Sequence, residues 1–346
     1  MFSCHDRPSR FELAMGCALG IVFYSLAPAA ASWKERLLSE APSKWAALEQ
    51  YYSKLEVSYR KIITAPSEGK PLPLTFQGTI YCDTRQNGEM MVCTDHHVGK
   101  DGKGKQRDTT NVRGVNSRYT FTLGKTASDA ESFVLINFQP VSDQARQKVR
   151  GSGGNEYDMA FKVQFVRLID LLKDPLFTFD VHAVQRNGKE LVQLEYDRQL
   201  VKQNQQGSAH KKVIGTEHGT ILLDPERCWS IQEHHFENPD WKGNSFLEYG
   251  EERDGFPIIH RCKHTATHKQ LGTRLTIYEF DKFIHRDIPE SEFTLSAFGL
   301  PEMQVPGEQK PRTLWRWLIG IGLILGMLAV LLRIYVKKRQ QPLQQV

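Results

Sequence analysis

Histidine and cysteine side chains recur at even spacing near the end of the chain, at His260, Cys262, His264 and His268. On a β-strand, side chains alternate between two faces, so these four residues would share one face. Imidazole and thiolate groups two residues apart on a strand can bind one zinc or copper ion. His260, Cys262 and His264 are therefore a candidate metal site. The alternative is that the histidines are hydrogen-bonded residues of a half-polar sheet face.

Two further cysteines are placed symmetrically about the dipeptide Asn87-Gly88. Asn-Gly is the commonest two-residue hairpin turn, so Cys82 and Cys93 are expected to face each other on paired strands. Export to an oxidising compartment would allow a disulfide, and we predict one between these two residues. For Cys228 and Cys262, a simple meander leaves about two strand spacings between them, which is too far for a bond without a bulge. Their state stays open.

The sequence contains none of the common catalytic signatures, neither GxSxG, P-loop, HExxH nor GxGxxG. The acidic residues between 248 and 254 surround a turn, which is typical of a solvated sheet edge. We therefore predict that the protein is not an enzyme. We predict no cofactor, with zinc or copper at the His/Cys face as the alternative.

The N-terminus has the order of a cleaved export signal. Arg7 and Arg10 precede an apolar stretch over residues 13–26, and the small residues Ala27-Pro28-Ala29-Ala30-Ala31 follow it. The apolar stretch is shorter than the roughly 20 residues that a spanning helix needs. We predict a signal peptide over residues 1–31, with a retained signal anchor as the alternative.

Residues 314–336 form an apolar stretch long enough to cross a bilayer as one helix. Basic residues are more numerous after it than before it, which places the C-terminus in the cytoplasm. The sequence thus predicts a single-pass cell-membrane protein with a cytoplasmic tail over residues 337–346 and its domain on the extracytoplasmic, periplasmic side. Gly322 and Gly326 form a GxxxG pair, which permits close packing of two such helices in a homodimer.

The composition between these ends is that of an ordinary globular domain. The whole chain has 40% hydrophobic and 25% charged residues and a net charge of +5. A glycine- and lysine-rich run over residues 99–107 has no interleaved aromatic residues, so it indicates a solvated loop and not a nucleic-acid site. Nucleic acid is not an expected partner.

Apolar periodicity predicts two amphipathic helices, over residues 43–64 and 156–173. Most of the remaining chain consists of strand-like segments separated by turn signals such as Asn187-Gly188. Short strands after isolated helices indicate an α+β fold, in which a large curved antiparallel sheet, a half-barrel, is covered by the two helices. We expect this domain over residues 32–299 and a proline-rich stalk over residues 300–313.

The order of these elements resembles the LolA/LolB-like lipoprotein carriers. The resemblance rests on the first helix, on Phe76-Gln77-Gly78, on the run from Gly219 to Pro225, and on Gly255-Phe256-Pro257 before a long strand. Residues 288–301 also look like the segment before the anchor in uncharacterised membrane-anchored envelope proteins of planctomycete-type bacteria. The resemblance implies a helix-covered half-barrel whose apolar cavity accepts acyl chains.

A protein with a membrane anchor cannot shuttle freely, so we predict tethered binding of a lipid or lipoprotein acyl chain. The candidate cavity-lining residues come from the two predicted helices: Trp45, Leu48, Tyr52, Leu55, Phe161, Phe165 and Leu168. Ordinary core packing is the alternative for each of them. Two other functions stay open, namely a structural or sensory protein-interaction module without a ligand, and a metal-binding or redox protein that uses the His/Cys face.

Overall fold

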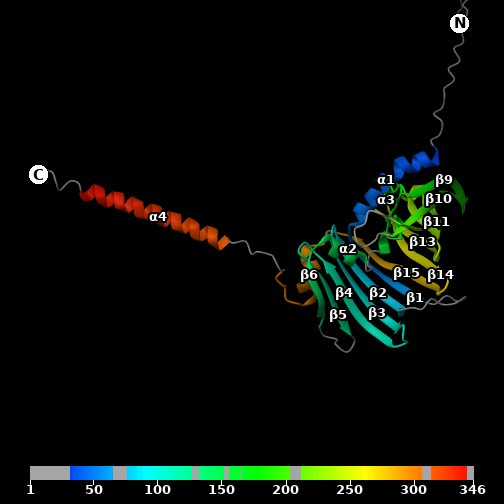
Figure 1. Cartoon of the computed structure of the whole chain (residues 1–346), viewed down its shortest axis with the longest axis horizontal. Coiled ribbons are helices and arrows are strands. Elements are labelled where there is room, and N and C mark those ends of the chain that lie inside the picture. Colours follow the sequence, from blue (N-terminus) through cyan, green and yellow to red (C-terminus); the bar gives the residue numbers. More distant parts are fainter. Residues whose placement is uncertain are drawn as a thin grey trace, which may run out of the picture.

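One open antiparallel sheet dominates the structure. The structure is a computed structural model, and it describes residues 32–64, 76–126, 132–151, 156–164, 166–202, 212–305 and 313–340. In this part of the chain the sheet has 13 strands, in the order β6-β5-β4-β3-β2-β1-β15-β14-β13-β12-β11-β10-β9. The sheet is curved, and helices lie against one of its faces (Figure 1). The predicted α+β class with a large curved antiparallel sheet is confirmed.

The strands of the sheet are β1 (Lys54–Thr64), β2 (Phe76–Asn87), β3 (Met90–Asp101), β4 (Gln106–Val115), β5 (Tyr119–Thr126), β6 (Val134–Pro140), β9 (Phe177–Arg186), β10 (Lys189–Lys202), β11 (Lys212–Asp224), β12 (Ser230–Glu237), β13 (Trp241–Arg253), β14 (Phe256–His268) and β15 (Gly272–His285). A separate hairpin pairs β7 (Lys162–Val163) with β8 (Val166–Arg167). The helices are α1 (Trp33–Tyr52), α2 (Asp143–Gly151), α3 (Leu168–Leu171) and α4 (Thr313–Gln340), with short 3-10 turns η2 (Glu156–Ala160), η3 (Pro225–Arg227), η4 (Glu290–Phe293) and η5 (Leu295–Phe298).

Helix α1 begins at a capping box. The Ser32 hydroxyl accepts a hydrogen bond from the Glu35 amide at 3.2 Å, and the Glu35 carboxylate accepts one from the Ser32 amide at 2.8 Å. The helix ends at Tyr52, so the prediction of a helix to residue 64 is wrong in its second half. From Lys54 the chain pairs with β2 on one side and β15 on the other, and Val57, with its β-branched side chain, suits that strand.

The second predicted helix, over residues 156–173, is also wrong. This segment is a compact run of η2, the β7–β8 hairpin and α3, and the Leu168 amide donates a hydrogen bond to the Phe161 carbonyl at 3.0 Å. Gln164 has a positive φ of 48°, which no regular helix accommodates. The apolar spacing that resembles a helix arises because each short element turns its apolar side chains to the same core.

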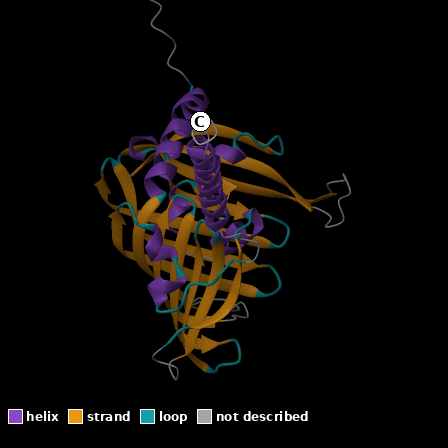
Figure 2. Cartoon of the chain, turned by 90° about the vertical axis from the view of Figure 1, so that its left-hand side faces the viewer, coloured by secondary structure: helices purple, strands orange, loops and turns teal. Residues whose placement is uncertain are grey.

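The face of the sheet that α1 covers is called the inner face here, and the opposite face is the outer face. The main core lies between the inner face, α1 and the segment Glu156–Leu171 (Figure 2). The indole nitrogen of Trp45 donates to the Trp229 carbonyl at 2.9 Å, and the Tyr52 hydroxyl donates to the Pro257 carbonyl at 2.7 Å. Both bonds tie α1 to the C-terminal half of the sheet.

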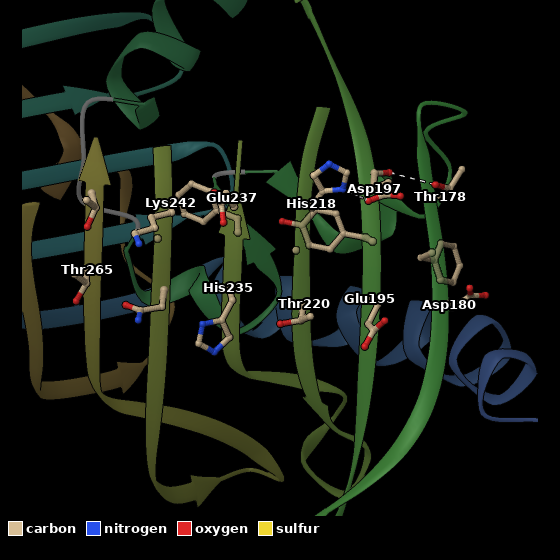
Figure 3. A pocket seen from close by; sticks show the side chains of 17 residues that line it. Thr178, Asp180, Glu195, Asp197, His218, Thr220, His235, Glu237, Lys242 and Thr265 are labelled. Carbon is tan, nitrogen blue, oxygen red and sulfur yellow. Dashed lines mark hydrogen bonds and ion pairs between the residues drawn. The ribbon is translucent and has the colours of Figure 1, made fainter. Parts of the chain in front are cut away.

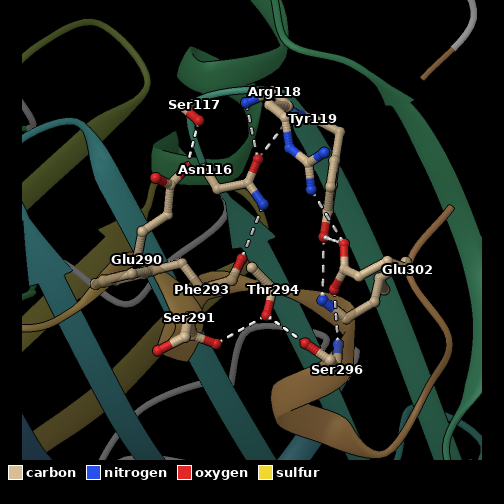
Figure 4. Close-up of polar contacts among 11 residues, drawn as sticks. Asn116, Ser117, Arg118, Tyr119, Glu290, Ser291, Phe293, Thr294, Ser296 and Glu302 are labelled. Carbon is tan, nitrogen blue, oxygen red and sulfur yellow. Dashed lines mark hydrogen bonds and ion pairs between the residues drawn. The ribbon is translucent and has the colours of Figure 1, made fainter. Parts of the chain in front are cut away.

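The outer face of β3–β5 is covered by a segment called here the C-terminal strap, residues 286–305. Its apolar residues Phe293 and Leu295 pack with Val112 and Phe121 in a second core. Polar contacts hold the strap in place, since the Tyr119 hydroxyl donates to the Glu302 carboxylate at 2.6 Å (Figure 4). Residues 300–305, predicted as part of a stalk, therefore pack against the domain. Residues 306–312 lie outside the described residues.

The two Asn-Gly hairpins differ. At Asn187-Gly188 both residues have positive φ and Arg186 pairs with Lys189, as predicted. In the other hairpin Asn87 pairs with Met90, so the turn lies one residue later, at Gly88-Glu89. The Asn87 amide nitrogen instead donates to the Ile288 carbonyl of the strap at 2.7 Å. The strap therefore holds the Asn87 side chain, and Asn87 is the last residue of β2 and not part of the turn.

This register makes the predicted disulfide wrong. Cys82 lies opposite Asp95 and Cys93 lies opposite Thr84, and both cysteines are buried free thiols. They are diagonal neighbours, which lie about 7–8 Å apart in an antiparallel pair, whereas the Cα atoms of a disulfide are usually about 4.4–6.8 Å apart.

Helix α4 contains a stretch, Leu318–Lys337, that is long and apolar enough to cross a membrane, with a mean hydropathy of 2.3. Gly322 and Gly326 lie on this helix, and the homodimer that they permit stays a prediction. The predicted signal peptide, residues 1–31, lies outside the described residues.

The register of the first hairpin predicts the outcome of a disulfide substitution. Thr84 lies directly opposite Cys93, and counting from the two-residue turn makes this a non-hydrogen-bonded pair with Cα atoms about 4.5 Å apart. We expect Thr84→Cys to form a disulfide with Cys93 on mild oxidation, which mass spectrometry of a non-reduced digest detects. The wild-type chain under the same oxidation is the control. A Cys82–Cys93 bond in either sample would contradict the register.

Candidate functional site

Phe161 lies between two small clefts on the inner face. Its ring stacks on Tyr52 of α1 with a centroid separation of 5.7 Å. One cleft has a volume of about 260 Å³ and is lined by Tyr52, Met91, Tyr157 and Phe161 among others. The second, of about 190 Å³, is lined by Trp45, Ala46, Ile169 and Phe161 among others. Both clefts also share Glu49.

Charged side chains form the rim of these clefts. Arg167 binds Glu49 at 3.1 Å and Asp170 at 2.6 Å, and Lys162 forms an ion pair with Asp158. Burial raises the pKa of Asp158 to about 6, even though the Lys162 charge acts in the opposite direction. Each cleft therefore combines aromatic and aliphatic lining side chains with charged ones.

The six predicted cavity residues that the structure describes are part of one core. Their exposed fractions are 2% for Trp45, 0% for Leu48, 2% for Tyr52, 1% for Leu55, 3% for Phe161 and 1% for Leu168. Trp45, Tyr52 and Phe161 border the clefts, whereas the three leucines fill space behind them. Phe165 lies outside the described residues. Leu55 belongs to β1 and not to a helix.

A row of buried polar groups crosses the inner face beside this core. The Tyr59 hydroxyl donates to the Glu156 carboxylate at 2.5 Å, and Lys61 donates to the same carboxylate at 3.1 Å. Farther along, Arg113 pairs with Asp95, which also accepts a bond from the Cys93 thiol at 3.1 Å. The sequence did not reveal this row, because its members come from segments up to 97 residues apart.

The buried thiols of Cys82 and Cys93 are weakly nucleophilic. Burial raises the pKa of both Cys82 and Cys93, and the Asp95 carboxylate raises it further. A thiol with a raised pKa is protonated near neutral pH and is a poor nucleophile.

The structure does not bring the three predicted metal ligands together. His260 is exposed and Cys262 is fully buried, because the pairing of β13 with β14 skips His260 between Arg261 and Ile259. This extra residue is a β-bulge, which breaks the even alternation on which the metal prediction rested. His264 lies half-buried beside Ser245, with its Nδ1 at 2.9 Å from the hydroxyl. Among the described residues no group of three His, Cys, Asp or Glu side chains could hold a metal ion.

Cys228 and Cys262 are both free thiols. Cys228 has a left-handed backbone with φ of 56°, and its thiol donates to the Gly255 carbonyl at 3.7 Å. Cys262 is buried in the core, and burial raises its pKa to about 12.

Two histidines, the buried His234 and the half-buried His264, share the inner face with the core. His234 Nε2 lies 2.9 Å from the Tyr196 hydroxyl, which donates to Glu217 at 3.3 Å. Burial lowers the pKa of His234 to about 3 and that of His264 to about 4, and for His264 the positive charges of Arg274 and Lys61 add to this effect. Both imidazoles are therefore neutral at physiological pH.

The outer face has a larger hollow, a groove of about 890 Å³ that runs across β9–β14 (Figure 3). Its outward-facing lining residues are polar: Thr178, Asp180, Glu195, Asp197, His218, Thr220, His235, Glu237, Lys242, Asn244, Thr265 and Thr267. Each strand contributes every second residue to the groove. In the sequence, such alternating polar residues indicate only the solvent-exposed face of a strand. Only the curvature of the assembled sheet brings them into one groove.

The chain matches no family model and no curated protein. Among solved structures it is similar to a LolA superfamily protein from Nitrosomonas europaea, at 8% sequence identity and a TM-score of 0.34. That similarity covers 74% of this chain and 97% of the other. Nothing about function follows from a similarity of this size, and the resemblance to planctomycete-type envelope proteins stays a prediction.

The neutral histidines predict a loss of stability in acid. In the unfolded chain a histidine binds a proton near its ordinary pKa of 6.5, whereas in the fold His234 and His264 do so only near 3 and 4. Their contribution is therefore complete above pH 6.5 and falls as the pH decreases through that window. At about pH 4.5 each should cost about 2–3 kcal/mol of unfolding free energy.

The test compares urea unfolding of the full chain in detergent micelles at about pH 7 and about pH 4.5. His264→Gln should reduce the difference between the two conditions by about 2–3 kcal/mol. His260→Gln, at an exposed histidine of the same strand, is the matched control and should leave the difference unchanged. Equal behaviour of the two variants would contradict the burial of a neutral His264.

Proposed function

We propose that this chain is a membrane-anchored binding protein for a lipid or a lipoprotein acyl chain. The acyl chain would bind at the inner face of the sheet, between α1 and the segment Glu156–Leu171. The observation that carries this proposal is the position of Phe161 between two clefts with an apolar floor. The molecule needs no catalytic group for this role, and we propose none, nor any zinc or copper.

The size of the clefts supports a gated site. Each has a volume below the roughly 300–1,000 Å³ that is typical of ligand pockets. If the Phe161 ring leaves its place on Tyr52, the two clefts and the space of the ring join into one cavity within that range. An acyl chain would then occupy the space between Trp45 and Met91.

The segment that carries Phe161 is suited to such a movement. It consists of a 3-10 turn, a hairpin of two-residue strands and one turn of helix. Elements this short are only weakly stable by themselves, so local opening costs less than unfolding of the sheet. The cations Lys162 and Arg167 lie at the rim, where they would meet an anionic or zwitterionic headgroup.

The anchor supports a local role. A domain attached to α4 stays beside one membrane, so the proposal is tethered binding and not transport across a compartment. We place the domain on the periplasmic side and the C-terminus in the cytoplasm, on the basis of the predicted export signal and the basic residues after α4.

A first test concerns the ring that separates the clefts. Phe161→Ala should lower the unfolding free energy by about 3–5 kcal/mol, as expected for a buried phenylalanine, and should increase the amount of bound fatty acid. The measurement is crosslinking of a photoactivatable fatty acid to the full chain in detergent micelles, with the modified peptides identified by mass spectrometry.

Phe293→Ala is the matched control, because Phe293 is equally buried in the second core on the outer face. It should destabilise the chain by a similar amount without more crosslinking. Equal gains in the two variants would show that general loosening, and not the joining of the clefts, admits the probe.

A second substitution should obstruct the site without disturbing the core. Ala46 is exposed and lines the smaller cleft, so Ala46→Trp should fill that cleft and reduce fatty-acid crosslinking by about tenfold, with little change in stability. Gln50→Trp, on an exposed position of the same helix outside the lining, should have no effect. Unchanged crosslinking in the Ala46 variant would argue against this site.

A second candidate function is a protein-interaction module without a ligand. The complete burial of Leu48, Leu55 and Leu168 favours it, because side chains fill most of the inner face. Native mass spectrometry of the purified chain separates the two functions. A ligand-free protein that takes up no fatty acid would support the interaction module.

A further inference from the structure

We propose that the groove on the outer face of β9–β14 docks an extended, lysine- or arginine-rich peptide segment of a partner protein. This site lies on the opposite face of the sheet from the clefts at Phe161, so it is independent of the proposed lipid site (Figure 3).

The charge of the groove is opposite to that of the whole chain. Four carboxylates line it, from Asp180, Glu195, Asp197 and Glu237, against the single ammonium group of Lys242. The chain as a whole has a net charge of +5. A local excess of negative charge in a hollow attracts cations and raises the rate at which a basic partner associates.

The neighbours of these carboxylates neutralise them only in part. Lys34 lies 3.7 Å from Asp180, whose side chain is 92% exposed. The partners of Asp197 and Glu195 are histidines, His218 and His182, which carry a positive charge only when protonated. Glu237 has no ion-pair partner in the described part of the chain.

The groove also contains an acceptor that lacks a donor. The Asn244 side-chain oxygen is buried and has no hydrogen-bond partner among the described residues. Buried acceptors are almost always satisfied in folded proteins, and the Asn244 amide gains a partner if its side chain turns toward a donor in the groove. Lysine and arginine side chains carry only donors, and a peptide backbone adds N–H groups.

The extent of the groove favours a peptide over a small cation. The carboxylates are distributed over β9, β10 and β12, and the hollow reaches β14. Six neighbouring strands at about 4.8 Å spacing span roughly 24 Å, which equals about seven residues of extended chain. An anionic bilayer surface is excluded as the occupant because its charge has the same sign as that of the groove.

The probe for the test is a fluorescent eight-residue peptide of alternating lysine and threonine. Its binding to the full chain, held in nanodiscs of zwitterionic phosphatidylcholine, is measured by fluorescence anisotropy at low and high salt. We expect saturable binding that weakens with salt, and about tenfold weaker binding to the variant Asp180→Lys with Glu237→Lys.

The matched control is Glu251→Lys with Asp281→Lys, which changes the net charge equally at exposed positions outside the groove. This control should bind the peptide within about twofold of the wild type. A further variant, Asn244→Ala, changes no charge and should weaken binding severalfold. The proposal is overturned if the peptide does not bind, or if both double variants weaken binding equally, since net charge alone would then explain the attraction.

Discussion

The pairing of β1 with β15 joins the two halves of the sheet. Strands β2–β6 extend from one side of β1, and β14–β9 extend from the other side of β15. The register runs from Leu55 opposite His285 to Thr64 opposite Leu275, so it brings together residues more than 200 positions apart in the chain. Contacts of such separation close a long loop, and the entropic cost of that closure is offset by the hydrogen bonds and side-chain packing along the pair. The groove lies on strands of one half only, β9–β14, whereas α1, which lines both clefts at Phe161, bonds across to that half from the N-terminal side of the junction.

This arrangement of strands determines which segments cover the two faces of the sheet. Helix α1 precedes β1 directly and folds back over the inner face, where Trp45 bonds to the Trp229 carbonyl in the opposite half. The C-terminal strap follows β15 directly and crosses the outer face to β3–β5. Each half is therefore held by a segment that enters from the other side of the junction. The exposed outer face of β9–β14 is what this arrangement leaves uncovered, and it is there that the groove lies.

Local sequence patterns predicted the elements better than their contacts. The strand-rich class and the Asn187-Gly188 turn follow from propensity alone, and the structure agrees with both. The other Asn-Gly turn is displaced because the Asn87 side chain bonds to a strap that is distant in sequence. Likewise, the even spacing of His260 and Cys262 places both side chains on one face only if the strand is regular. A bulge at His260 breaks that regularity and separates them. The apolar spacing at 43–64 fits a helix and a strand at once, and only pairing on both sides of β1 decides between them. Among the site residues, Trp45, Tyr52 and Phe161 follow from such spacing, whereas the groove depends on curvature that no short pattern encodes.

The strap also determines how far the domain can move from its anchor. It is packed in the second core as far as Val305, and α4 begins at Thr313, which leaves seven residues between them. A fully extended chain of this length reaches at most about 25 Å. With α4 in a bilayer, the domain would stay within about 25 Å of the end of that helix, and a ligand of the proposed sites would be drawn from the same thin layer beside the membrane. A lipid or partner held in the same layer meets the domain at a high effective concentration, so modest intrinsic affinities suffice for occupancy.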